Sequence, residues 1–124
     1  GMKQVLLVFA GGGFGSALRF IMSKGLNPFF KNFFLGTFLS NIIGCFLIGL
    51  LLGFFNKGKF LNENQVLLLV VGFCGGFTTF STFVFEKYSL IKSGELLHFI
   101  LYFSSSIIIG ISAVVLGLWV SKIV

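Results

Sequence analysis

The stretch GFCGGFTTFSTF, residues 72–83, decides the fold that this sequence predicts. It lies in an apolar run, residues 66–85, of about 20 residues, which is long enough to cross a bilayer as one helix. Its centre is unsuited to a continuous helix, because Gly75-Gly76 is followed closely by Thr78-Thr79, and both residue types disfavour helix interiors. We therefore predict an all-α fold in which this third transmembrane helix is broken at mid-membrane. Broken backbone at that depth is tolerated only where protein buries it or a polar cavity adjoins it, and its freed groups can bind ions.

The composition is that of a membrane protein. Of the 124 residues, 56% are hydrophobic and 10% are charged, and the mean hydropathy is +1.08. The net charge of +6 does not indicate nucleic acid, because the basic residues stand at the ends of apolar runs, where they meet lipid headgroups. Cys45 and Cys74 fall inside apolar segments and are interpreted as small buried residues, not as a disulfide or a metal pair.

The apolar runs predict one transmembrane domain, residues 1–124, with four helices. The predicted spans are residues 5–22, 33–55, 66–85 and 96–120. Gly1 is set aside as foreign to the natural chain, and no cleaved signal peptide is expected. Gly11 and Gly15 form a small-xxx-small face for close helix contact. A phosphate-binding glycine loop is excluded there, because its sixth position is Ser16 and no strand precedes it.

The basic residues do not favour one orientation in the membrane. Four spans place both termini on one side, and the lysines outside the spans divide equally between the two sides. Those on the terminal side are Lys3, Lys57, Lys59 and Lys122, and those on the other side are Lys24, Lys31, Lys87 and Lys92. Equal numbers predict insertion in both directions. Because four short helices are few to enclose a pathway, we expect an antiparallel homodimer with a two-fold axis in the membrane plane.

Charged groups that drive transport or catalysis are missing from the middle of the predicted spans. Glu63, Glu86 and Glu95 fall at segment ends or in loops, and His98 lies near an interface. No metal cluster and no nucleophile–base pair can be assembled, so we predict that the chain is not an enzyme. A small dual-topology exporter of organic cations is disfavoured, because a proton-coupled exporter usually needs a buried carboxylate.

The remaining candidates for contact with a permeating ion are a few polar and aromatic side chains. Asn41 either makes a hydrogen bond between helices or donates a hydrogen bond to a permeating anion. Phe80 and Phe83, three residues apart on one helical face, either pack or present their positive ring edges to an anion. Arg19 either snorkels to the interface or attracts anions from an aqueous vestibule.

The fourth segment carries further hydroxyls. Tyr102 and Ser106, four residues apart, share a helical face that Gly110 extends. Their hydroxyls either form a polar track or, as serines commonly do, bond back to their own helix. The carbonyls freed by the break would instead favour a hard cation of the sodium type.

These residues resemble a known family. The motif GGFTTFSTF, residues 75–83, with Glu86 closely resembles the signature of the Fluc/CrcB fluoride channels. Shorter matches in the first two segments occur in the same order and spacing: Gly15 with Arg19 and Phe20, and Gly36-Thr37 with Asn41 and Gly44. The likeness covers essentially the whole chain.

The resemblance implies a multi-pass inner-membrane protein, a dual-topology antiparallel homodimer with two pores that passively exports fluoride and protects the cell from its toxicity. It implies a structural Na⁺ at the dimer centre, held by the main-chain carbonyls of Gly75 and Thr78 from both subunits. The residues that match the family's fluoride pore are Asn41, Phe80, Phe83, Tyr102 and Ser106, with Thr37 and Arg19 as weaker matches. Gly110 stands where a further serine would extend the track.

A third interpretation is a glycine-packed assembly subunit without transport, in which Asn41 and the Thr78-Thr79 break serve packing only. A Phe80→Ile variant separates this interpretation from the channel, because a pore would lose ion flux while its dimer stayed intact.

Overall fold

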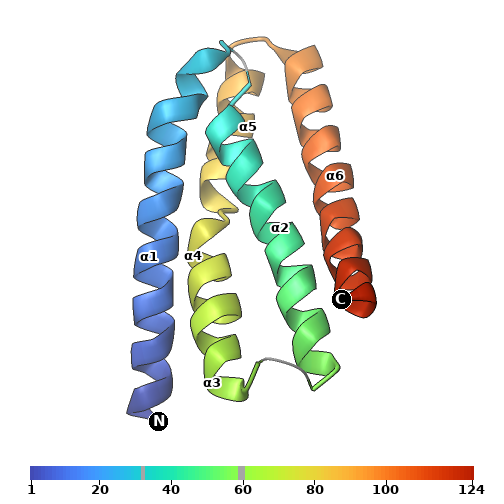
Figure 1. Ribbon diagram of the computed structural model, residues 1–124. Coiled ribbons are helices and arrows are strands. Elements are labelled where there is room, and N and C mark those ends of the chain that lie inside the picture. Colours follow the sequence, from blue (N-terminus) through green and yellow to red (C-terminus); the bar gives the residue numbers. More distant parts are fainter. Residues whose placement is uncertain (32, 59–60) are drawn as a thin grey trace.

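The computed structural model describes residues 1–31, 33–58 and 61–124, which are helical apart from short connections (Figure 1). The helices are α1 (Met2–Leu26), the 3₁₀ turn η1 (Asn27–Phe29), α2 (Leu35–Asn56), α3 (Glu63–Val66), the π-helical η2 (Leu67–Cys74), α4 (Gly75–Phe77), α5 (Ser81–Lys92) and α6 (Leu96–Ile123). They form four segments that are long and apolar enough to cross a membrane: Met2–Phe29, Leu35–Asn56, Glu63–Lys92 and Leu96–Ile123. The predictions of an all-α fold and of four such segments are confirmed.

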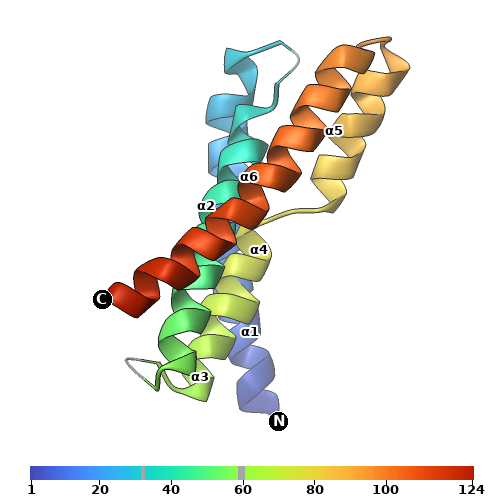
Figure 2. The same cartoon turned by 90° about the vertical axis from the view of Figure 1, so that its right-hand side faces the viewer.

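The third segment is interrupted where the sequence predicts it. α4 ends at Phe77, Thr78 takes an extended conformation (φ −88°, ψ 157°), and α5 begins at Ser81. Figure 2 shows that α5 continues along a line displaced sideways from α4. Before the interruption the segment packs on α1, through η2 and α4, whereas α5 packs on α6. The interruption therefore allows one membrane segment to change neighbours halfway along its length.

Glycines allow two helix pairs to approach at backbone distance. A Cβ atom at Gly11 or Gly15 of α1 would collide with carbonyl oxygens of the third segment. In the same way, a Cβ at Gly49 of α2 would collide with α6, and one at Gly117 of α6 with α2. The predicted small-residue contact face of the first segment is thus confirmed, and a second one joins α2 to α6, which crosses it obliquely in Figure 2.

The third segment does not end at Glu86 and Lys87, as the sequence interpretation has it. α5 runs on to Lys92, and both residues lie inside it and are buried. The reason is helical periodicity: they share a face with Phe83 and Leu90, and this whole face is covered by the rest of the chain. Glu86 and Lys87 therefore end the run of apolar residues, but they do not end the helix.

A glycine ends α5. Gly94 adopts the left-handed conformation, with φ +80°, just beyond the helix. The amides of Gly94 and Glu95 donate to the carbonyls of Ile91 and Leu90 at 3.1 and 2.9 Å. These two bonds are those of a Schellman cap, which satisfies carbonyls that the helix end leaves free.

Both termini lie in the lower part of Figure 1, as four crossings require. The lysine count needs one correction, because Lys87 is a buried helix residue and not a loop residue. Lys59, also counted, lies outside the described residues. Without Lys87 the sequence has four lysines on the terminal side and three on the other. This small difference still does not favour one orientation.

Candidate functional site

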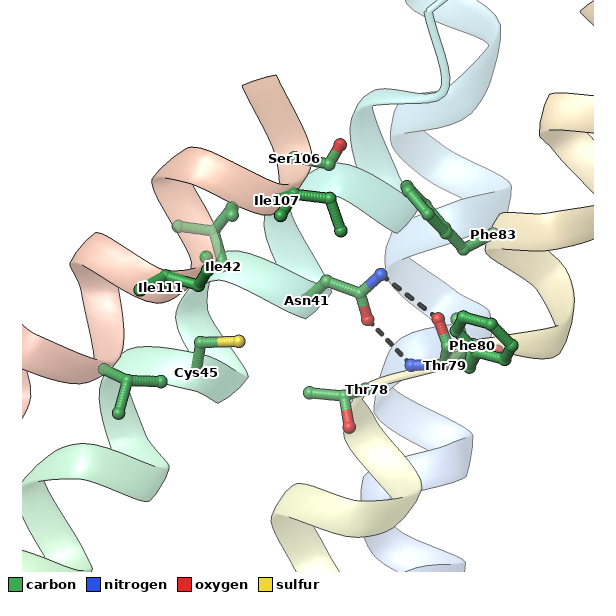
Figure 3. Close-up of a pocket in the computed structure, with 12 residues that line it drawn as sticks. Asn41, Ile42, Cys45, Thr78, Thr79, Phe80, Phe83, Ser106, Ile107 and Ile111 are labelled. Atoms are coloured by element: carbon green, nitrogen blue, oxygen red, sulfur yellow. Dashed lines mark hydrogen bonds between the residues drawn. The ribbon is translucent and has the colours of Figure 1, made fainter. Parts of the chain in front are cut away.

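A groove of about 430 Å³ opens between α2, the interruption and α6 (Figure 3). Four of the predicted pore residues line it: Asn41, Phe80, Phe83 and Ser106. Thr78 and Gly110 line it too. Most of its other lining residues are apolar. The groove therefore brings together predicted pore residues from the second, third and fourth segments.

Asn41 joins α2 to the interrupted backbone. Its side-chain oxygen accepts from the amide of Thr79 at 2.7 Å, and its side-chain nitrogen donates to the carbonyl of Thr79 at 3.1 Å (Figure 3). Both peptide groups lose helical partners at the interruption, and Asn41 replaces them. An amide nitrogen carries two protons, so one N–H of Asn41 remains for another acceptor. Asn41 thus makes the predicted hydrogen bond between segments and still keeps one donor at the groove.

Phe80 and Phe83 both line the groove, three residues apart at the start of α5, but they differ in exposure. Phe80 lies in the interruption, before the first turn of α5, and is 79% exposed. Phe83 lies within α5 and is 5% exposed. Phe80 already has helical dihedral angles (φ −92°, ψ −41°), and its carbonyl accepts from the amide of Val84 at 2.8 Å, so it caps the start of α5.

Ser106 is the groove residue whose hydroxyl has no partner. Among the described residues, its buried Oγ makes no hydrogen bond. Three other serines of α6 do bond back to their own helix. Ser105 donates to the carbonyl of Tyr102 at 3.2 Å, Ser112 to that of Ile108 at 2.8 Å and Ser121 to that of Leu118 at 2.6 Å. A buried hydroxyl without a partner is rare in native structures. Ser106 is therefore the donor of α6 that is available to a ligand in the groove.

Tyr102 and Thr37 meet beyond Phe83, around a carboxylate. Thr37 donates its hydroxyl to Glu86 Oε2 at 2.6 Å, and the hydroxyl of Tyr102 lies 3.0 Å from Glu86 Oε1 and 3.2 Å from the carbonyl oxygen of Phe34. All three side chains of this cluster are buried. The sequence interpretation left Glu86 outside the membrane; its position three residues after Phe83 was the signal that it shares the helical face of the pore residues.

Arg19 bonds to a carbonyl at the end of α4, just before the interruption. Its Nε donates to the carbonyl of Gly76 at 3.0 Å, and Ser16 donates to the same oxygen at 3.5 Å. α1 extends to Leu26, so Arg19 lies within the helix and not near its end. Its snorkelling to the membrane interface stays a prediction. Whether an anion meets the rest of the guanidinium stays a prediction.

The two carbonyls predicted to hold Na⁺ are among those that the interruption deprives of helical partners. In a continuous helix the amide of Thr79 would donate to Gly75, and that of Thr82 to Thr78. Here the first donates to Asn41, and the second to the hydroxyl of Thr79 at 3.2 Å. Among the described residues no hydrogen bond reaches either carbonyl oxygen. Free carbonyl oxygens suit a hard cation, so the residues fit the predicted ion.

Comparison with known proteins supplies a family. A family profile described as CrcB-like protein, Camphor Resistance (CrcB), matches residues 6–118. A relative from Azobacteroides pseudotrichonymphae is 44% identical over 117 residues, which is 94% of both chains. Relatives from Phocaeicola vulgatus and Gloeothece citriformis are each 43% identical over 122 residues, 98% of this chain and 100% and 98% of theirs. All three are named fluoride-specific ion channel FluC. The chain therefore belongs to the CrcB family, whose members at this level of similarity are named as fluoride channels.

Proposed function

We propose that the chain is a fluoride-specific ion channel of the cell inner membrane, which lets F⁻ leave the cell down its electrochemical gradient. The observation that carries this proposal is the groove, where the unpartnered hydroxyl of Ser106 and the amide of Asn41 lie beside Phe80 and Phe83. The naming of its relatives as fluoride channels supports the ion's identity. Membership of a channel family also confirms the expectation that the chain is not an enzyme.

The groove's chemistry suits a small anion that must lose water. Hydroxyl and amide donors and the positive edges of aromatic rings each replace part of its hydration shell. None of these groups is charged, so the anion is bound weakly enough to leave, as conduction requires. From the groove the path continues past Phe83 towards Tyr102 and Thr37. A passive path serves a cell in acid surroundings, where HF enters, dissociates and traps the anion inside.

We infer that the working unit is an antiparallel homodimer with two pores. The groove is open, and Phe80 at its edge is 79% exposed in the single chain. A second copy would cover both. The near-equal lysine counts support insertion of the chain in both directions. A two-fold axis in the membrane plane would then set the two interruptions facing each other at mid-membrane.

We propose that Na⁺ is held between those interruptions by the carbonyl oxygens of Gly75 and Thr78 from both copies. Gly75 is exposed, and a Cβ there would find only the Val70 carbonyl oxygen, at 3.8 Å. A bound cation would offset the repulsion between the partial negative charges of the four carbonyl oxygens, two from each copy. The role is structural, since the ion would hold the two interruptions together.

Fluoride efflux from liposomes tests the channel. We expect vesicles holding the purified protein to lose F⁻ rapidly and Cl⁻ not at all, as read by ion-selective electrodes. Phe80→Ile should lose most F⁻ flux while remaining dimeric, whereas Phe14→Ile, a change of an equally exposed phenylalanine on α1, should not. No F⁻ loss from vesicles shown to contain folded dimer would refute the proposal.

The same assay distinguishes the fluoride channel from a small exporter of organic cations. The buried Glu86 removes the sequence argument against such an exporter, because a carboxylate does lie inside the third segment. Family membership now favours the channel. A channel passes F⁻ without a proton gradient, whereas an exporter would move an organic cation only when protons flow the other way.

A further inference from the structure

Lys87 is a buried cation whose ammonium has no hydrogen-bond partner among the described residues. The residue is 5% exposed, inside α5 and one position after Glu86. Buried ammonium groups are costly unless they are paired and hydrogen-bonded. An ammonium that meets no oxygen or nitrogen acceptor at such a site therefore needs an explanation in terms of what it binds.

The aromatic rings of two predicted pore residues hold the ammonium in place. Its Nζ lies 3.9 Å from the ring centroid of Phe83 and 3.0 Å from that of Tyr102. The faces of these rings are negative, so they attract the cation, although they offer it no oxygen or nitrogen acceptor. Phe83 also lines the groove, so the ring that contacts the ammonium also adjoins the groove where we place the fluoride path.

The neighbouring carboxylate does not occupy the ammonium. Among the described residues, no ion pair joins Lys87 to an acidic group. Each oxygen of Glu86 is instead within hydrogen-bond distance of a hydroxyl, one from Thr37 and one from Tyr102. The anionic member of the pair is thus satisfied within the protein, and the cationic member is not. An incoming anion would find an ammonium that has no hydrogen bond and no contact ion pair among the described residues.

We propose that Lys87 is an anion-attracting residue of the fluoride pathway, placed at the end of the groove beyond Phe83. This rests on the proposed channel function. The ammonium acts in two ways: its charge stabilises F⁻ between the groove and the Tyr102 cluster, and its position on the ring face of Phe83 makes the ring edge more positive. Both effects lower the F⁻ concentration at which the pathway fills.

The test compares four purified proteins in liposomes: wild type, Lys87→Met, Lys87→Arg and Lys92→Met. Lys92 lies on the same helix and is exposed, so its substitution removes the same charge without touching the pore residues. The readout is the internal F⁻ concentration that gives half-maximal efflux, because this value does not depend on how much of the protein is active. Gel filtration checks that each variant is a folded dimer.

We expect Lys87→Met to raise the half-saturating concentration about tenfold, the order of change expected from loss of a unit charge several ångströms from an anion. Lys87→Arg, which keeps the charge, and Lys92→Met should stay close to wild type. An unchanged value in folded Lys87→Met, or an equal increase in Lys87→Arg, would overturn the inference. Should the methionine variant not fold, Lys87→Gln provides the same comparison. Absence of F⁻ efflux from the wild type would instead refute the channel, and this inference with it.

Discussion

Replacing Asn41 by leucine should destabilise the protein as well as impair conduction. The side chain makes two hydrogen bonds to Thr79, at 2.7 and 3.1 Å, in the half-buried interruption. A typical hydrogen bond contributes about 0.5–1.5 kcal/mol, and a buried donor or acceptor left without a partner costs about 1–3 kcal/mol. Partial access of water to Thr79 reduces the second figure. We therefore expect Asn41→Leu to lower the free energy of unfolding by about 2–4 kcal/mol.

Unfolding of the detergent-solubilised protein by SDS, followed by circular dichroism, measures this loss. Asn41→Asp keeps the acceptor for the Thr79 amide and loses the donor to its carbonyl, so its loss should be intermediate. Asn64→Leu, the same change at an exposed position of α3, is the control. If Asn41→Leu unfolds within about 0.5 kcal/mol of wild type, the usual range for a neutral surface change, the pair of bonds to Thr79 does not hold the interruption.

The polar track and a helix cap give two further predictions. Gly110→Ser should fold and raise F⁻ efflux, because its hydroxyl would extend the track and its Cβ would make only ordinary contacts, with the Sγ of Cys45 at 3.7 Å and the Cδ1 of Ile42 at 3.9 Å. Gly117→Ser, whose Cβ would collide with the backbone of α2, should yield little folded dimer by gel filtration. Gly94→Ala should lower the free energy of unfolding by about 1–2 kcal/mol in the same SDS titration, because φ is +80° there and no other atom is near, whereas Gly25→Ala, in an equally open place on α1, should not destabilise.

Local sequence chemistry was enough to predict the interruption. Gly75-Gly76 and Thr78-Thr79 disfavour a helix wherever they stand, and the break falls at Thr78. The glycine contacts were predictable for the same reason, because a missing Cβ permits close approach whatever the partner. Local chemistry could not give the partners. The bonds from Arg19 to Gly76 and from Asn41 to Thr79 join residues 57 and 38 positions apart, and only the packed fold decides them.

The buried charges were misplaced for a different reason. Hydropathy treats Glu86 and Lys87 as the end of an apolar run, so it put both at the membrane surface. Helical spacing carries the opposite signal, since these residues lie three and four positions after Phe83 and so on its face. Their burial depends on tertiary partners: two hydroxyls bond to the carboxylate, and two rings cover the ammonium. Charged residues that follow a pore residue at helical spacing should therefore be considered as members of the site before they are assigned to the membrane surface.

One redirected amide links the two kinds of site that we propose. When the Thr79 amide turns from Gly75 to Asn41, it leaves the Gly75 carbonyl free for a cation and at the same time fixes the asparagine whose remaining N–H adjoins the groove. The cation site and the anion donor are then consequences of the same break and cannot be adjusted independently. This explains why Asn41→Asp is the informative variant. It preserves the acceptor, so it should keep the Gly75 carbonyl free for Na⁺, yet it removes the donor and adds a negative charge where F⁻ would pass.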